Sequence, residues 1–154
     1  MFAHEIQSVC SKHYLLDLAT ERICTADQLP DSPDFYPAYY FVNTLTNKDA
    51  YMPGHWILVM HSSPYEIEYF DPLALPKWQY PLCLREKITN YSHNDLIVQN
   101  VQSTACASFC LYVAFKKLQG RSLLSIQKDL LDVHSSTDDR AIRTLCKKEK
   151  LTIL

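Results

Sequence analysis

At the centre of this chain lies the stretch QNVQSTACASFCLYVAFKKL, residues 99–118. Ser103 is a favourable N-cap, so the pattern predicts a helix from Thr104 onwards with Cys106 in its first turn. Nearly every later position is apolar, and Gly120 is typical of the residue that follows such a helix. A helix that is apolar on all sides lies inside a domain. The sequence therefore predicts a buried central helix with a cysteine at its N-terminal end.

That position could make Cys106 reactive. The backbone N–H groups at a helix start favour negative charge, which lowers the pKa of a thiol there and can stabilise an oxyanion. Taken alone, a cysteine at a helix start is more often a buried structural side chain, as we expect for Cys110 one turn later. A catalytic role for Cys106 therefore depends on a base elsewhere in the chain.

The composition is that of one globular domain, spanning residues 1–154. The chain has 47% hydrophobic and 21% charged residues and no apolar run of about 20, so we expect no membrane span. Its net charge of −2 argues against a strongly nucleic-acid-binding surface. Six cysteines without a signal-peptide pattern indicate free thiols in a reducing, intracellular compartment. The cysteine spacing does not match a structural zinc site, and we expect no metal and a monomer.

Periodicity along the chain predicts an α+β domain, with strands first and helices gathered at the end. The predicted helices cover residues 3–18, 82–90, 122–133 and 137–148, in addition to the central one. The last of them has Asp138 and Asp139 in its first turn. The predicted strands cover residues 38–45, 55–61, 65–71 and 95–99. The predicted loops cover residues 25–37, 47–53 and 72–81.

Two of these strands form a hairpin that supplies the base. If the loop at 62–64 closes evenly, His55 faces Asp71 across the strands, with their Cβ atoms about 5 Å apart. A carboxylate in that position fixes the tautomer of an imidazole and supports its charged form. A one-residue slip or a bulge would put the two side chains on opposite faces. His61 shares the strand face of His55 and competes as the base, although we expect it at the solvated turn end.

These residues together supply the parts of a thiol protease, which are a thiolate, a base, an acid that orients the base and oxyanion donors. Cys106, His55 and Asp71 fill the first three roles. Gln99, seven residues before Cys106, could donate a side-chain N–H to the oxyanion, and the backbone N–H of Cys106 could donate another. Gln102 competes with Gln99 for this role.

Three motifs carry a family resemblance: GHW at residues 54–56, FDP at 70–72 and QNVQSTACASFC at 99–110. In this order they resemble the adenovirus protease, or adenain, family within the superfamily of ubiquitin-like-protein proteases. The segment at 35–59 also resembles that family's approach to its catalytic histidine, and the likeness covers roughly residues 3–118. It implies an adenain-like cysteine protease fold, in which a small mixed or antiparallel sheet packs on the central helix.

The resemblance also implies a role for each matching residue. His55 would be the base, Asp71 its orienting acid and Cys106 the nucleophile. Gln99 and the Cys106 N–H would be the oxyanion donors, and Trp56 would pack beside the histidine in the substrate cleft.

The chain departs from the family at several points. Ala107 stands where the family usually has glycine, and Asp71 stands where the adenovirus enzyme has glutamate. That enzyme is stimulated by DNA and by a short peptide bound through a disulfide. An activating peptide is therefore implied here, whereas the acidity of the chain argues against DNA stimulation. Cys83 lies in the interval comparable to the disulfide position, and it also fits a spare buried thiol.

By resemblance, the expected function is that of a cysteine endopeptidase acting through a thioester, with no cofactor needed for the chemistry. Its substrates would be viral capsid or core precursors cut at small-residue, Gly-rich sites, in the host nucleus and the virion. One alternative is a deconjugating protease for a ubiquitin-like modifier. Another is a non-catalytic binding domain that keeps the fold, for which Ala107 is the only hint.

Overall fold

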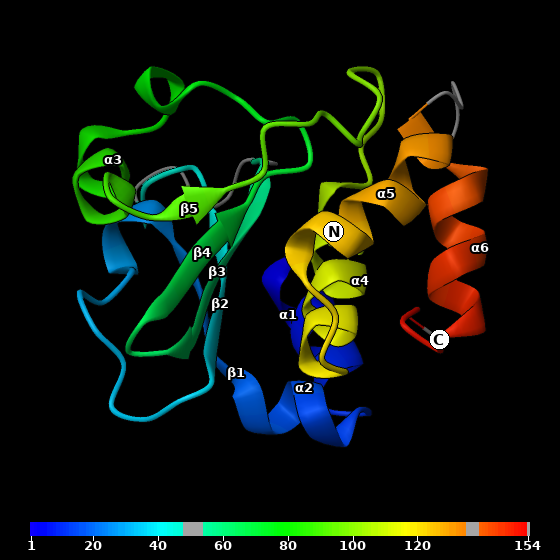
Figure 1. Cartoon of the computed structure of the whole chain (residues 1–154), viewed down its shortest axis with the longest axis horizontal. Coiled ribbons are helices and arrows are strands. Elements are labelled where there is room, and N and C mark those ends of the chain that lie inside the picture. Colours follow the sequence, from blue (N-terminus) through cyan, green and yellow to red (C-terminus); the bar gives the residue numbers. More distant parts are fainter. Residues whose placement is uncertain (48–53, 135–138, 154) are drawn as a thin grey trace.

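The computed structural model describes residues 1–47, 54–134 and 139–153, and it combines helices with one mixed sheet (Figure 1). The helices are α1 (Ala3–Cys10), α2 (Tyr14–Ala19), α3 (Leu82–Ile88), α4 (Cys106–Leu118), α5 (Leu123–His134) and α6 (Arg140–Lys148). The strands are β1 (Thr20–Thr25), β2 (Ala38–Asn43), β3 (Trp56–Ser63), β4 (Glu66–Phe70) and β5 (Ser92–His93). Two short 3-10 turns are η1 (Ala26–Gln28) and η3 (Lys77–Gln79). The predicted α+β class is confirmed.

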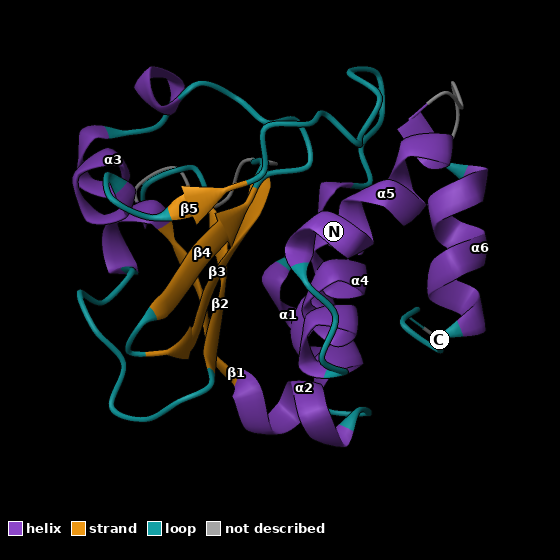
Figure 2. Cartoon of the chain, viewed as in Figure 1, coloured by secondary structure: helices purple, strands orange, loops and turns teal. Residues whose placement is uncertain are grey.

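The five strands follow one another in the sheet in their sequence order. β1 runs parallel to β2, and β4 runs parallel to β5, while the two inner pairings are antiparallel. The sheet lies between α3 on one side and α4 with α1 on the other (Figure 2). The ends of β3 and β4 that lead to His55 and Asp71 are thus placed beside the start of α4.

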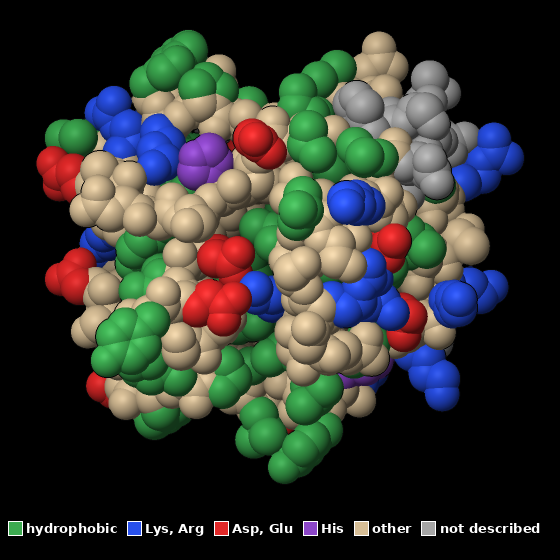
Figure 3. All heavy atoms as spheres, in the orientation of Figure 1, with side chains coloured by type: hydrophobic (Ala, Val, Ile, Leu, Met, Phe, Trp, Pro, Cys, Tyr) green, Lys and Arg blue, Asp and Glu red, His purple; other side chains and the backbone are tan. Residues whose placement is uncertain are grey.

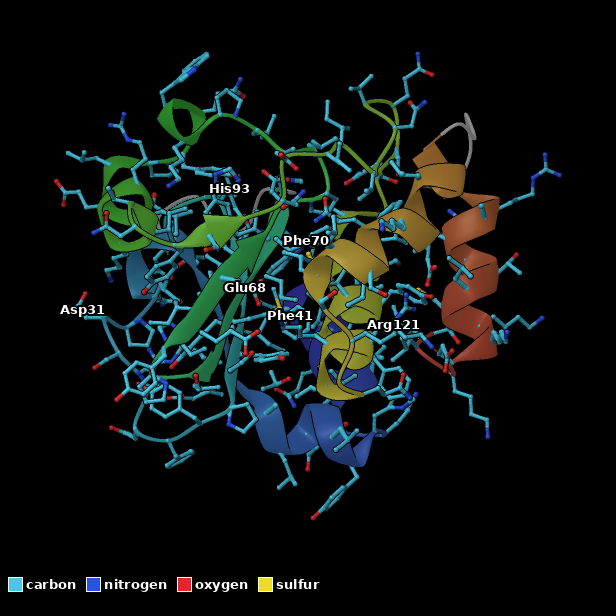
Figure 4. The ribbon with its side chains drawn as sticks, viewed as in Figure 1. Asp31, Phe41, Glu68, Phe70, His93 and Arg121 are labelled. Atoms are coloured by element: carbon cyan, nitrogen blue, oxygen red, sulfur yellow. The ribbon has the colours of Figure 1, made fainter. Side chains whose placement is uncertain are left out.

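The central helix packs on the sheet as the apolar pattern predicted. Every residue of α4 from Cys106 to Ala114 except Ser108 is buried. These residues form one core cluster with Phe41 and Phe70, which point from the sheet toward α4 in Figure 4. The opposite face of the sheet packs in a second cluster, with Ile57 among its members and α3 covering it. Residues of β3 are buried on both faces, so α4 meets a rigid surface.

The start of α4 differs from the prediction. The helix begins at Cys106 with Ala105 as its N-cap, so Cys106 is the first helical residue. Ser103 lies before the helix because its N–H is engaged by the carbonyl of Asn100 at 2.9 Å. Its hydroxyl accepts the N–H of Ala105 at 3.1 Å instead of a donor inside the helix. The nucleophile candidate therefore sits closer to the free helix end than expected.

The hairpin has the predicted faces but not the predicted register. Leu58 pairs with Phe70, whereas an even closure at 62–64 would have paired it with residue 68. The turn lies at residues 64–65 because the Ser63 hydroxyl accepts the N–H groups of Tyr65 and Glu66, at 3.2 and 3.1 Å, and a bulge precedes it. The pairing near the site is shifted by two residues, which is an even number, so the side-chain faces are preserved.

Two other predicted elements are wrong. The helix expected at 3–18 is interrupted at residues 11–13, where the N–H groups of Lys12 and His13 bond to carbonyls three residues back. No strand forms at 95–99. Instead the N–H groups of Val98 and Gln99 both donate to the carbonyl of Pro72, at 2.9 and 3.0 Å. That bond fixes the segment beside the turn after β4 rather than in the sheet.

The remaining differences concern edges and loops. β1 was not predicted, because its TERICT sequence is mostly polar; this strand lies at one edge of the sheet. The short pair Ser92–His93 forms the opposite edge in place of the strand at 95–99. Asp138 and Asp139 were expected in the first turn of the last helix. Asp139 is instead the N-cap of α6, and Asp138 lies outside the described residues. Most of the loop predicted at 47–53 also lies outside them.

His61 is not at a solvated turn. Because β3 continues to Ser63, this histidine is only 2% exposed and its ring meets those of Tyr40 and Tyr91 edge to face. Burial lowers the pKa of His61, although the charge of Glu21 opposes this. The residue is therefore a core side chain, and it is separated from the site that His55 occupies.

Candidate active site

Cys106 opens onto a cavity of about 730 Å³. The sulfur is at the first position of α4, and the residue is 7% exposed. The cavity wall is built from the N-terminal residues, the ends of β1 and β2, the approach to β3 and the loop before α4. Its lining includes Asn43, Gly54, His55, Trp56, Gln99 and Ser103. Two of the three sequence motifs, GHW and the segment that leads to Cys106, thus meet at this cavity.

His55 bridges the thiol and a carboxylate. Its Nε2 lies 2.6 Å from Oδ1 of Asp71, and the side chains of the two residues are 16% and 1% exposed. His55 is also hydrogen-bonded to the Cys106 thiol. Since Nε2 is occupied by Asp71, the thiol is left with Nδ1. The predicted His55–Asp71 contact is present although the two residues lie just beyond the paired strand ends.

The Asp71 carboxylate is held by further donors. The N–H groups of Leu73 and Leu75 donate to its two oxygens at 2.8 and 3.3 Å, and the Tyr80 hydroxyl donates to Oδ2. Burial, together with the charge of Asp71, raises the pKa of Tyr80, so this hydroxyl keeps its proton and remains a donor. With so many donors, the carboxylate has one orientation from which to receive His55.

Asn94 fixes the backbone of Asp71. Its Oδ1 accepts the Asp71 N–H at 2.8 Å, and its Nδ2 donates to the Asp71 carbonyl at 2.6 Å and to the Leu96 carbonyl at 3.1 Å. The residue is 2% exposed. Neither Asn94 nor Tyr80 was predicted as part of the site. Both follow loop-like sequence, and no local pattern distinguishes them from ordinary turn residues.

The electrostatics favour a charged Cys106–His55 pair. Burial raises the pKa of the Cys106 thiol, but the hydrogen bond from His55 and the backbone N–H groups of Trp56 and Ala107 outweigh it and bring the pKa below its usual value. Burial lowers the pKa of His55, but the hydrogen bonds to Asp71 and Cys106 outweigh it and raise the pKa to about 9. Both shifts act in the direction of a thiolate beside an imidazolium.

Most of the other cysteines behave in the opposite way. Burial raises the pKa of Cys10 and of Cys24 to about 11 and that of Cys146 to about 12. Burial and the charge of Cys106 raise the pKa of Cys110 well above its usual value, and its thiol donates to the Trp56 carbonyl at 3.5 Å. Cys110 is thus the structural thiol that its position one turn after Cys106 predicted.

Gln99 also reaches the cavity. It is 2% exposed, and its Nε2 donates to the carbonyl of Ser103 at 3.0 Å, while its Oε1 has no hydrogen-bond partner within the described ranges. An amide nitrogen has two hydrogens, so one remains for an oxyanion. The backbone N–H of Cys106 is a second donor, because the first residues of a helix have no intrahelical acceptor. Gln102 is exposed on the loop surface.

Gly54 and Trp56 flank the histidine. A Cβ added at Gly54 would lie 1.9 Å from Oδ1 of Asn43, so the GHW motif has glycine where the backbone and a buried amide meet. Trp56 is 5% exposed, and its indole Nε1 donates to the Met1 carbonyl at 2.9 Å. The Trp56 side chain packs in the core cluster of α4, and the backbone N–H of Trp56 donates to the Cys106 sulfur.

Two residues at which the sequence was compared with the adenain family, Ala107 and Cys83, can be located in the structure. Ala107 is 2% exposed and packs in the core, and it is not among the residues that line the cavity of Cys106. Its methyl group therefore leaves that cavity open. Cys83 is a free, partly buried thiol in α3. Within residues 1–47, 54–134 and 139–153, no three His, Cys, Asp or Glu side chains are arranged to hold a metal ion.

Surface charge is mixed. On the face shown in Figure 3, basic and acidic side chains lie side by side over the C-terminal half. Lys116 pairs with Glu149 at 2.5 Å, and Arg121 pairs with Asp129. Among the described helices, none has both the length and the hydropathy of a membrane span.

Comparison with models of known protein families gives no match, and none of the curated proteins matches the sequence.

Proposed function

We propose that this protein is a cysteine endopeptidase with an adenain-like fold. The observation that carries the proposal is the chain of contacts from the Cys106 thiol through His55 to the Asp71 carboxylate, at the wall of a cavity large enough for several residues of a peptide. A nucleophile, a base and an acid that orients the base are what thiol proteolysis requires.

The reaction follows from the atoms at this site. The Cys106 thiolate attacks the carbonyl carbon of the scissile bond, and the resulting oxyanion accepts hydrogen bonds from Gln99 Nε2 and the Cys106 N–H. The His55 imidazolium gives its proton to the leaving amine as the C–N bond breaks, which leaves a thioester on Cys106. Neutral His55 then takes a proton from a water molecule, whose oxygen attacks the thioester carbon. The C–S bond breaks, which releases the carboxylic acid product and restores the Cys106 thiolate. Asp71 holds His55 in one orientation throughout.

The cavity favours an uncharged peptide segment. Its described lining residues have no lysine, arginine, aspartate or glutamate side chain, and most of the exposed lining is apolar. A charged substrate side chain would lose its water there and would find none of these four side chains to pair with. Together with the family resemblance, this supports small, neutral residues at the scissile bond, as in Gly-rich sites of viral capsid or core precursors.

Thiol alkylation tests the proposal without a known substrate. An unperturbed thiol titrates near pH 8.5, so reaction of Cys106 with iodoacetamide well below about pH 7.5 would report a stabilised thiolate. We expect peptide mapping to find Cys106 modified first, and His55→Ala to move its reaction to the ordinary pH range. Cys110→Ser is the matched control, because that thiol lies one turn away and is not part of the pair.

Substrate tests distinguish the kinds of protease. Cleavage of Gly-rich precursor peptides that is lost in Cys106→Ala supports the endopeptidase. Cleavage only of ubiquitin-like substrates after their C-terminal Gly-Gly would point to deconjugation instead. Ordinary reactivity of Cys106, together with no turnover on either class, would favour a binding domain and overturn the proposal.

A further inference from the structure

Ser103 joins three parts of the candidate site through its own polar groups. Its N–H donates to the Asn100 carbonyl at 2.9 Å, and its carbonyl accepts Nε2 of Gln99 at 3.0 Å. Its hydroxyl accepts the N–H of Ala105, the residue before the nucleophile, and donates to Oδ1 of Asp139. The residue that orients the Gln99 amide is thus itself held by a side chain from the C-terminal helix.

Asp139 lies at the start of a helix that packs against α4. It is the N-cap of α6, and its side chain is 13% exposed. α6 packs along α4, where the buried Cys146 thiol donates to the Ser108 carbonyl at 3.5 Å. Figure 1 shows α6 on the side of α4 that faces away from the sheet. This helix lies beyond residue 118, outside the part of the chain that resembles the adenain family.

We propose that Ser103 and Asp139 are positioning residues, which hold the Gln99 amide where an oxyanion forms. The inference rests on the proposed function. Without the Ser103 hydroxyl, the loop loses its bond to α6 and Ala105 loses its acceptor, so the carbonyl that directs Gln99 is free to shift. A displacement of about 1 Å at a reacting group can cost about 100-fold in rate.

The expected kinetic result separates positioning from substrate binding. Ser103→Ala and Asp139→Ala should lower kcat by about 10- to 100-fold with little change in KM, because the oxyanion exists only in the transition state. Ser103→Thr keeps the hydroxyl and should restore most of the rate. Neither residue contacts the thiol or His55, so the pH dependence of Cys106 alkylation should stay as in the wild type.

A double substitution tests whether the effect passes through Gln99. If Ser103 acts by orienting this amide, Ser103→Ala should cost at most a few-fold in kcat when added to Gln99→Ala, rather than 10- to 100-fold. Gln102→Ala is the matched control, because its side chain is exposed on the same loop and it is not among the cavity-lining residues.

A second readout does not depend on catalysis. The side-chain amide signals of Gln99 in a ¹⁵N-labelled protein, assigned with Gln99→Ala, should move in Ser103→Ala and Asp139→Ala but not in Gln102→Ala. Unmoved Gln99 signals would overturn the inference even if no substrate were cleaved, and so would moved signals with unchanged kcat. Hydrolysis that persists in Cys106→Ala would instead overturn the proposed function, which keeps the two failures distinct.

Discussion

Gly54→Ala tests the tightest contact beside the candidate base. The added Cβ would lie 1.9 Å from Oδ1, 2.6 Å from Cγ and 2.7 Å from Nδ2 of Asn43. Ordinary contact begins near 3.4 Å, so the amide must retreat by about 1.5 Å, the difference between 3.4 and 1.9 Å. Asn43 is 7% exposed, and its Oδ1 accepts the Leu45 N–H at 3.0 Å, so it cannot retreat without losing that bond.

The expected cost adds two effects. Overpacking a well-packed site costs about 1–3 kcal/mol, and the lost hydrogen bond adds about 1 kcal/mol. Gly54→Ala should therefore lower the free energy of unfolding by about 2–4 kcal/mol. For a domain of this size that corresponds to a Tm lower by roughly 4–16 °C in calorimetry. Because Gly54 adjoins His55, we also expect slower alkylation of Cys106 near neutral pH.

A double variant and a control variant test whether the clash with Asn43 causes this loss of stability. Adding Asn43→Ala to Gly54→Ala removes the clashing amide, so the pair should be more stable than the sum of the single effects predicts. Gly120→Ala is the control, since its φ of +93° strains any side chain but no atom lies within 4 Å of the added Cβ. Its cost should be independent of Asn43. A wild-type Tm for Gly54→Ala, or no coupling with Asn43→Ala, would refute the account.

Tyr80→Phe removes a buried donor from the Asp71 carboxylate and should lower the free energy of unfolding by about 1.5–3 kcal/mol in urea, and an unchanged midpoint would contradict that role. Asn94→Ala removes three bonds to backbone groups and should cost at least as much, whereas the exposed Asn90→Ala should not. Burial lowers the pKa of His61, so as the pH falls this histidine takes up a proton in the unfolded chain before it does so in the folded one. The contribution of neutral His61 to the free energy of unfolding is therefore fully present above about pH 6.5 and decreases as the pH falls below that value. His61→Phe should flatten that dependence between about pH 6.5 and 5, and an equally steep decline in the variant would assign it to other groups.

The parts of the fold that sequence predicted are those set by local periodicity. The apolar run of α4 and the alternation in β3 and β4 report burial directly, so these elements were placed within a few residues. The pattern fixes the face of each side chain but not the pairing register, which is why His55 and Asp71 met although Leu58 pairs two residues away from its expected partner. The turn chemistry of Ser63 decided that register.

The rest depends on contacts between distant segments. The run at 95–99 has the composition of a strand, yet the carbonyl of Pro72 binds it to a turn, which no local pattern reveals. Tyr80 and Asn94 reach Asp71 from 9 and 23 residues away and have no sequence signal of their own. The contacts of His55 with Cys106 and Asp71 could be predicted, whereas the residues that hold this group in place could not.

The carbonyl of Pro72 has a further consequence for the motions of the molecule. It accepts the N–H groups of Val98 and Gln99, residues that are 0% and 2% exposed. The N–H of Asp71, the residue before Pro72, is a third bonded amide, because it donates to Oδ1 of Asn94. In hydrogen exchange, amides of an irregular loop normally exchange quickly, whereas these three are buried and bonded like those of a core strand. We expect them to be protected until the domain unfolds as a whole. Asp71 and Gln99 would then open together, in one cooperative event, and never one without the other.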